Sequence, residues 1–142
     1  MAPVATEPVH IFIVEDNLGD VLLVREALKE SSLQFELRHA ADGEEAIQAL
    51  SNDHIRPDLV LLDINLPKRD GWEVLDEIRA NPDTRDVPVV VLSSSGSPED
   101  RARASRNLPS MYIQKPSNLE DFLAVGKTIE EFLRETGSGV GA

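Results

Sequence analysis

Five short apolar runs recur along the chain, and longer segments of mixed polarity separate them. The runs are Val9–Val14, Phe35–Leu37, Leu59–Leu62, Val89–Leu92 and Met111–Ile113. Three of them are β-branched and nearly continuous, which is typical of strands buried on both faces of a parallel sheet. The second run lies in a stretch where polar and apolar residues alternate, which favours an edge strand with one wetter face.

The segments between the runs carry the start signals of helices. We predict helices over Leu18–Glu30, Gly43–Asn52, Gly71–Asn81, Pro98–Arg106 and Leu119–Glu135. Capping-box pairs, in which a short polar residue precedes an acid by three positions, begin at Asp42, Asp70 and Ser117. Ser97 is followed by a proline and two acids, a pattern that favours a helix start. The fivefold alternation of strand and helix predicts an α/β fold with a parallel sheet and right-handed crossovers.

The last two predicted helices differ in apolar content. The last one carries apolar residues at spacings of 3, 4 and 3, namely Phe122, Val125, Ile129 and Phe132. This stripe favours a face turned to the core, and the alternative is that its far end contacts a partner. The preceding helix offers only two alanines as apolar anchors, beside three arginines, so we expect it to be weakly held. It is either a solvated face or a movable contact surface.

Composition narrows the class of protein. The 142 residues fit one domain, which we place at residues 9–135 between flexible tails at 1–8 and 136–142. The formal net charge of −12 argues against nucleic acid and anionic membranes as partners, because phosphate contacts need Lys and Arg. The chain has no cysteine, and we find neither a signal peptide nor a run of about 20 apolar residues. We therefore expect a soluble, cytoplasmic protein.

Polar side chains gather where four of the predicted strands end. They are Glu15, Asp16, Asp63, Asn65, Ser93 and Lys115. The carboxyl ends of parallel strands meet at one edge of the sheet, where ligands bind. Three carboxylates that lie close together repel one another unless a cation joins them, and oxygen ligands suit Mg²⁺ rather than zinc. A lysine and a hydroxyl on the other side then suggest that a phosphoryl group binds between them and the metal.

Other interpretations of these residues are blander. A lone Asp after a strand is most often a turn residue or a cap, but Asp70 already serves as the next cap. A nucleotide-binding Rossmann domain would need a glycine-rich turn after the first strand, where this chain has acids. An aspartate-nucleophile phosphohydrolase would need a second Asp at position 65, which is Asn. The three histidines are scattered, and we interpret them as structural or exposed.

In order and spacing, four motifs make the chain resemble the response-regulator receiver domains of two-component signalling. The motifs are "IFIVEDN", "DLVLLDINLPKRDGWEVL", "PVVVLSSSG" and "YIQKP". The resemblance implies a flavodoxin-like (βα)5 fold with strand order 2-1-3-4-5. It also implies that Asp63 is the phosphoacceptor and that Glu15 and Asp16 bind Mg²⁺ together with it. The backbone carbonyl of Asn65 would be a further metal ligand.

The same resemblance assigns the remaining residues. Ser93 and Lys115 would each bond a phosphoryl oxygen, and the Lys115–Pro116 peptide bond would be cis. Tyr112 would be the aromatic switch whose ring turns inward when Ser93 moves. On the residues alone, Tyr112 would be interpreted as a half-buried strand residue. A receiver-like binding module that is never phosphorylated stays an alternative.

The resemblance also implies partners. The phosphoryl donor would be a sensor histidine kinase or a histidine phosphotransfer protein. The pairing of "EDNLGD" with "DINLP" and the long final helix resemble phytochrome-associated single-domain regulators more narrowly, which suggests a bacterial phytochrome. We expect no enzymatic or DNA-binding output, so the signal would pass by phosphorelay or through the face of residues 98–135. That face is also where a homodimer would form.

Overall fold

The structure is a computed structural model that describes residues 7–136. The strands are β1 (Val9–Val14), β2 (Phe35–Ala40), β3 (Leu59–Leu62), β4 (Val89–Ser93) and β5 (Ser110–Gln114). The helices are α1 (Leu18–Glu30), α2 (Gly43–Ser51), α3 (Gly71–Ala80), α4 (Pro98–Ser105) and α5 (Leu119–Thr136). All strand pairs are parallel, in the order β2-β1-β3-β4-β5, which confirms the predicted doubly wound α/β fold.

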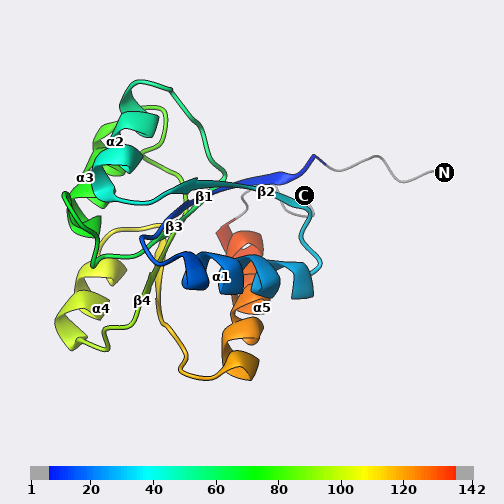
Figure 1. Ribbon diagram of the computed structural model, residues 1–142. Helices are drawn as coiled ribbons and strands as arrows, with labels where there is room; N and C mark the ends of the chain where they lie inside the picture. The colour runs from blue at the N-terminus through cyan, green and yellow to red at the C-terminus, as the bar shows by residue number, and fades with distance from the viewer. Residues whose placement is uncertain (1–6, 137–142) are drawn as a thin grey trace.

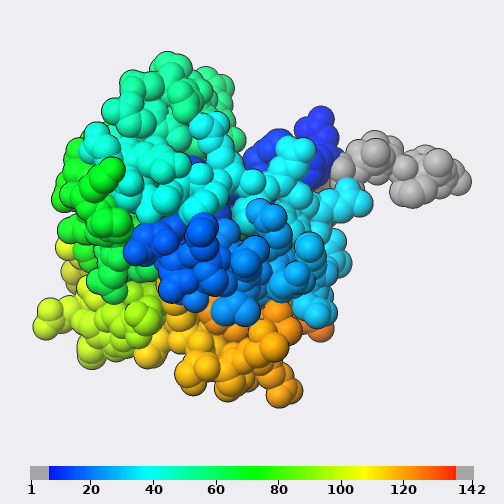
Figure 2. All heavy atoms as spheres, in the orientation of Figure 1, coloured from blue at the N-terminus to red at the C-terminus, as the bar shows by residue number. Residues whose placement is uncertain are grey.

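Two layers of helices cover the sheet. Helices α1 and α5 lie side by side on one face, and α2, α3 and α4 cover the other (Figure 1). Because successive side chains of a strand point to opposite faces, β1 serves both cores. Phe12 packs on the side of α2 and α3, and Ile11 and Ile13 pack on the side of α1 and α5. In the space-filling view, blue α1 and orange α5 form one continuous surface (Figure 2).

The strand register brings the carboxyl ends of the strands to one edge of the sheet. Val14 at the end of β1 pairs with Leu62 at the end of β3 and with Ala40 at the end of β2. Residues that follow these strands therefore meet, as the sequence predicts. Strand β2 extends three residues beyond its predicted end because its whole length pairs with β1, and its side chains alternate between half-buried and exposed as far as His39.

All five predicted helices begin at the predicted residues, but one predicted capping residue is wrong. The side chains of Asp42, Asp70 and Ser97 each accept a hydrogen bond from the backbone N–H three residues later. At α5 the cap is Asn118 rather than Ser117. The Asn118 Oδ1 atom accepts from the Asp121 N–H at 2.8 Å, and its amide donates to the Asp121 carboxylate at 2.9 Å. An asparagine provides both bonds, whereas a serine hydroxyl makes the capping bond alone.

The last two helices differ in burial as the sequence predicts. The apolar stripe of α5, including Phe122 and Phe132, is buried, so the interpretation of a core-facing stripe is confirmed. Helix α4 buries one residue, Ala104. None of the helices between residues 7 and 136 is both long and apolar enough to span a bilayer.

Two other expectations concern the backbone. The expected cis bond between Lys115 and Pro116 is wrong, because the one cis peptide bond within residues 7–136 joins Leu108 to Pro109. Cis and trans X–Pro bonds differ by only about 1 kcal/mol, so the local packing decides between them. The predicted tails fall largely on residues 1–6 and 137–142, outside the described residues, and α5 continues through Thr136.

Candidate acidic site at the strand ends

Three carboxylates meet beyond the ends of β1 and β3. Ligand oxygens of Glu15, Asp16 and Asp63 all lie within 4.8 Å of one another. Glu15 and Asp63 are buried, with exposed fractions of 3% and 7%, whereas Asp16 is exposed. The group therefore consists of two buried acids and one acid that faces solvent, and all its potential metal ligands are oxygens. Such a donor set suits a hard divalent cation.

The backbone of the sheet holds these acids in place. The Glu15 N–H donates to the Ala40 carbonyl oxygen and the Asp63 N–H to the Val14 carbonyl oxygen, both at 3.0 Å. Gly71, at the start of α3, packs directly on the Asp63 backbone. A Cβ atom at Gly71 would lie 2.4 Å from the Asp63 carbonyl oxygen, so a glycine is needed for this approach. The position of the Asp63 carboxylate is thus fixed by strand pairing and by α3.

Lys115 reaches into the acids from the end of β5. Its Nζ atom lies 2.6 Å from Glu15 Oε1, 2.7 Å from Asp20 Oδ2 and 3.2 Å from Asp63 Oδ2. The lysine side chain is 10% exposed. The other oxygen of Asp63, Oδ1, accepts a hydrogen bond from the Asn65 backbone N–H at 3.0 Å. Both carboxylate oxygens of Asp63 are therefore oriented by donors.

The electrostatics of the site follow from burial and from this lysine. Burial raises the pKa of Glu15 to about 7, an increase that the hydrogen bond from Lys115 limits and the charge of Asp63 reinforces. Burial by itself would lower the pKa of Lys115. Its hydrogen bonds to Asp20 and Glu15 and the charge of Asp63 outweigh burial and hold that pKa above its ordinary value. The site thus places a charged lysine beside a glutamate whose pKa is raised by burial.

Ser93 is fully buried at the end of β4, next to the loop that follows Asp63. Its Oγ atom accepts hydrogen bonds from the Ser95 N–H at 3.2 Å and from the Asn65 side-chain amide at 3.4 Å. The Tyr112 hydroxyl donates to the Ser95 carbonyl oxygen, and the Arg101 guanidinium lies 4.9 Å from the centroid of the Tyr112 ring. A short chain of contacts thus joins Ser93, Ser95, Tyr112 and α4.

The structure brings together all the predicted residues of the strand ends and adds some that the sequence reasoning missed. Asp20 contacts Lys115, and the Asn17 N–H donates to Glu15 Oε2 at 3.1 Å. The His39 ring nitrogen lies 2.7 Å from the Glu15 carbonyl oxygen. The first turn of a helix that follows a strand end lies over the same edge of the sheet. An acid in that turn, four residues after Asp16, is the signal that could have revealed Asp20.

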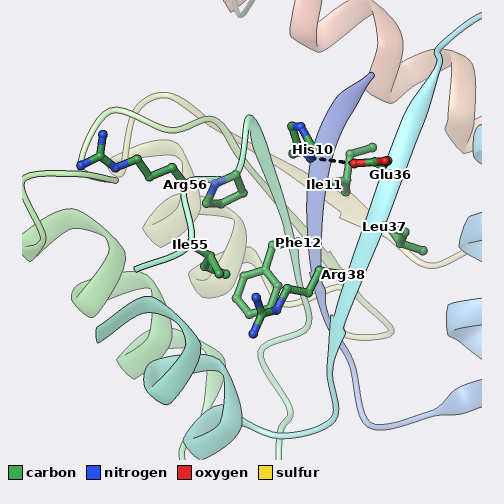
Figure 3. Close-up of a pocket in the computed structure, with 9 residues that line it drawn as sticks. His10, Ile11, Phe12, Glu36, Leu37, Arg38, Ile55 and Arg56 are labelled. Carbon is green, nitrogen blue, oxygen red and sulfur yellow. Dashed lines mark ion pairs between the residues drawn. The ribbon is translucent and has the colours of Figure 1, made fainter. Parts of the chain in front are cut away.

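A cavity lies elsewhere in the molecule and has none of the acids Glu15, Asp16 and Asp63 in its lining. The cavity of about 630 Å³ lies beside β1 and β2, with Phe12 and Ile55 among its walls (Figure 3). Its charged groups have partners. His10 lies 3.2 Å from Glu36, Arg38 2.8 Å from Asp53, and Arg56 3.3 Å from Asp83. We assign no function to this cavity.

Comparisons with known proteins agree on one family. The model of the response regulator receiver domain matches residues 11–126. Response regulator Rcp1 of Synechocystis sp. (strain PCC 6803) is 40% identical over 141 residues, which cover 96% of each chain. The structure of the phosphorylated cyanobacterial phytochrome response regulator RcpA has a TM-score of 0.82 and 41% identity, over 92% of this chain and 96% of that chain.

A second solved structure bears on the metal. The Mn²⁺-bound form of response regulator Rcp1 has a TM-score of 0.79 and 41% identity, over 88% of this chain and 94% of that chain. These relatives confirm both resemblances that the sequence suggested, to receiver domains and more narrowly to phytochrome response regulators.

Proposed function

The chain belongs to the family of response regulator receiver domains, and from that premise we propose that Asp63 accepts a phosphoryl group from a histidine of a sensor kinase. One observation carries the proposal. Asp63 stands at the carboxyl end of the central strand, with one oxygen 3.2 Å from the Lys115 ammonium and the other bonded to the Asn65 N–H. A structural turn residue would not need a buried cation beside it.

The chemistry proposed for Asp63 is a nucleophilic displacement. A carboxylate oxygen attacks the phosphorus of a phosphohistidine, and a P–O bond forms while the P–N bond breaks. The electron pair of the P–N bond stays on the imidazole, which takes up a proton. The Lys115 ammonium lies 3.2 Å from Asp63 Oδ2 and can donate to a phosphoryl oxygen after transfer. The chain is thus a phosphoacceptor that assists its own phosphorylation and dephosphorylation, and we do not assign it a separate enzymatic activity.

Receiver domains bind a divalent metal, and we propose Mg²⁺ for this chain. Glu15, Asp16 and Asp63 would hold it, with the backbone carbonyl of Asn65 as a further ligand. Their close, oxygen-only donor set supports this assignment. A bound Mg²⁺ would neutralise negative charge on the phosphoryl oxygens. The Mn²⁺-bound form of Rcp1 supports a divalent ion of this type.

Ser93 and Tyr112 are proposed to carry the phosphorylation signal to the surface. The Ser93 hydroxyl would turn from Asn65 and Ser95 to a phosphoryl oxygen. Because Tyr112 donates to the Ser95 carbonyl, movement of Ser93 would change the contact that holds the Tyr112 ring. The output surface is then the face built from α4, β5 and α5. It would bind another protein or a second copy of the chain, or the phosphoryl group would pass on through a relay.

The partners follow from the family and from charge. The donor is proposed to be a sensor histidine kinase or a histidine phosphotransfer protein. A bacterial phytochrome is suggested as the kinase by the similarity to RcpA, a cyanobacterial phytochrome response regulator. The net charge of −12 supports a protein partner with a basic face rather than nucleic acid or a membrane surface.

Acetyl phosphate and Mg²⁺ test the proposal without the kinase. Intact mass spectrometry should show a gain of about 80 Da in the wild type and none in Asp63→Asn. Asp76→Asn, which removes an exposed acid of α3, is the matched control and should gain the mass. A gain of equal size in Asp63→Asn would contradict the assignment. Chelating the metal with EDTA should abolish the gain in the wild type and in Asp76→Asn.

A further inference from the structure

Lys115 uses all three of its N–H groups on carboxylates. An ammonium carries three donors, and the Nζ atom contacts Glu15 Oε1 at 2.6 Å, Asp20 Oδ2 at 2.7 Å and Asp63 Oδ2 at 3.2 Å. The three acids come from β1, α1 and β3, so the lysine joins three separate elements. Of these contacts, the one to Asp20 has no role in the mechanism proposed above.

The three acids are not equivalent. Glu15 and Asp63 belong to the group whose ligand oxygens lie within 4.8 Å of one another together with Asp16, and Asp20 does not belong to it. Lys115 and a bound cation would therefore compete for the carboxylate oxygens of Glu15 and Asp63. Asp20 is the one partner of Lys115 that a cation in this group would leave in place.

Asp20 is also held independently of the lysine. Its backbone N–H donates to the Asn17 side-chain oxygen at 3.1 Å, and the Asn17 N–H donates to Glu15 Oε2 at 3.1 Å. These bonds close a ring that runs through Glu15, Asn17, Asp20 and Lys115. The carboxylate of Asp20 lies in the first turn of α1, where the helix dipole favours a negative charge. Its side chain is 24% exposed, so only part of its surface faces solvent.

We propose that Asp20 is a positioning residue for Lys115. It holds the ammonium beside Asp63 while Glu15 and Asp63 turn their oxygens to a divalent cation and a phosphoryl group. The lysine then exchanges two of its three bonds without losing its place. This inference rests on the phosphoacceptor function proposed above and extends it to a residue outside the set of strand-end ligands.

Removal of the Asp20 charge should affect both steps of the reaction. In Asp20→Asn, the charged partners left to Lys115 are Glu15 and Asp63, so the lysine competes with the cation for their oxygens. Mg²⁺ binding, measured by calorimetry, should weaken several-fold. The initial rate of phosphorylation by acetyl phosphate at saturating Mg²⁺ should fall about tenfold, as expected for loss of one charge-assisted hydrogen bond.

Two further variants separate positioning from charge and folding. Asp20→Glu keeps the carboxylate and should recover most of the rate. A role limited to helix stability would instead lower the free energy of unfolding of Asp20→Asn and leave the rate of its folded form unchanged. Glu26→Gln removes one negative charge from the exposed side of the same helix and should bind Mg²⁺ and react like the wild type. If Asp20→Asn reacts within twofold of the wild type at saturating Mg²⁺, the inference is overturned.

The ammonium of Lys115 gives a readout that does not depend on phosphorylation. In a ¹H–¹⁵N spectrum of the wild type with Mg²⁺, the protected Lys115 signal should persist, and Asp20→Asn should lose it. Loss of that signal in the wild type on addition of Mg²⁺ would overturn the inference. A wild type that keeps the signal but takes no phosphoryl group would instead refute the phosphoacceptor function alone.

Discussion

Helices α4 and α5 flank the same edge strand, β5, and they are held in opposite ways. Helix α5 buries seven residues, and Gly126 brings it against the backbone of α1. Its Glu130 carboxylate accepts hydrogen bonds from the Ser32 N–H and hydroxyl and pairs with Arg134 at 2.7 Å. Helix α4 buries only Ala104. The other contacts that hold α4 are made by polar side chains near the surface.

Two arginines of α4 contact aromatic rings, in place of the buried apolar side chains that hold the other helices. Arg101 stacks on Tyr112, and Arg103 lies 4.5 Å from the centroid of the Trp72 ring on α3. Such contacts are worth about 1 kcal/mol at exposed sites, far less than a buried aromatic side chain. Asp20, which contacts Lys115, therefore lies on α1, the helix against which α5 packs, while the weakly held α4 contacts Tyr112. A site that needs fixed geometry and a surface that needs to move are thus built on different parts of the fold.

The largest expected effect on stability is at the contact between α5 and α1. A Cβ atom at Gly126 would lie 1.9 Å from the Ala27 carbonyl oxygen, so Gly126→Ala must push α5 away from α1. We expect a loss of roughly 2–4 kcal/mol in the free energy of unfolding, measured with urea. Helix propensity alone would make this change stabilising by about 1 kcal/mol, so a gain in stability would contradict the close packing. Glu131→Ala, on the exposed side of the same helix, should change stability little.

An intermediate effect on stability is expected at Arg79, which ties the segment after α4 to α3; we call these contacts the tether of α4. The guanidinium of Arg79 on α3 donates to the carbonyl oxygens of Asn107 and Pro109, which follow α4, and to those of Arg85 and Val87. Burial lowers the pKa of Arg79. Arg79→Met should cost roughly 2–3 kcal/mol, because four carbonyl groups lose a charged donor.

The matched control for this change is Arg85→Met, because among the described residues the Arg85 side chain pairs only with the exposed Asp86, at 3.9 Å. We expect it to stay within about 0.5 kcal/mol of the wild type. Hydrogen exchange should be faster across residues 98–109 in Arg79→Met than in the wild type. Equal losses of stability in the two variants would mean that the tether is unimportant.

The smallest effect on stability is expected where Arg103 of α4 stacks on Trp72. Arg103→Ala should cost no more than about 1 kcal/mol and should change the fluorescence of Trp72, the one tryptophan of the chain. Exchange should increase in α4 and stay unchanged in α5. Arg106→Ala, at the end of α4 and without a ring partner among residues 7–136, serves as the control. A change that spreads to α5 would show that the two helices are not independent.

Much of this arrangement could be predicted from the sequence, because local signals and periodicity agree with the fold. The apolar runs mark the strands, the alternating run marks the edge strand β2, and Asp42, Asp70 and Ser97 mark helix starts. The poor anchoring of α4 could be inferred from its two alanines. The contacts that hold α4 could not, because the positions of Trp72 and of the carbonyl groups around Arg79 depend on tertiary packing.

The site shows the same division. Glu15, Asp16, Asp63 and Lys115 could be grouped because parallel strands end at one edge. Asp20 was missed because its role appears only when α1 is placed against Lys115. Two local details were also predicted wrongly. The cap of α5 is Asn118 rather than the neighbouring Ser117, which has similar capping chemistry. The bond before Pro116 is trans rather than cis, because packing selects between the two forms.

Chemical mapping of the phosphoryl group tests the role of Asp63 most directly. Borohydride reduces an aspartyl phosphate to homoserine, so the chain can be treated with acetyl phosphate and Mg²⁺, reduced, digested and sequenced by mass spectrometry. We predict homoserine at position 63 alone, and none when Mg²⁺ is replaced by EDTA. Homoserine at another aspartate, or a phosphorylated protein without homoserine at position 63, would contradict the proposal.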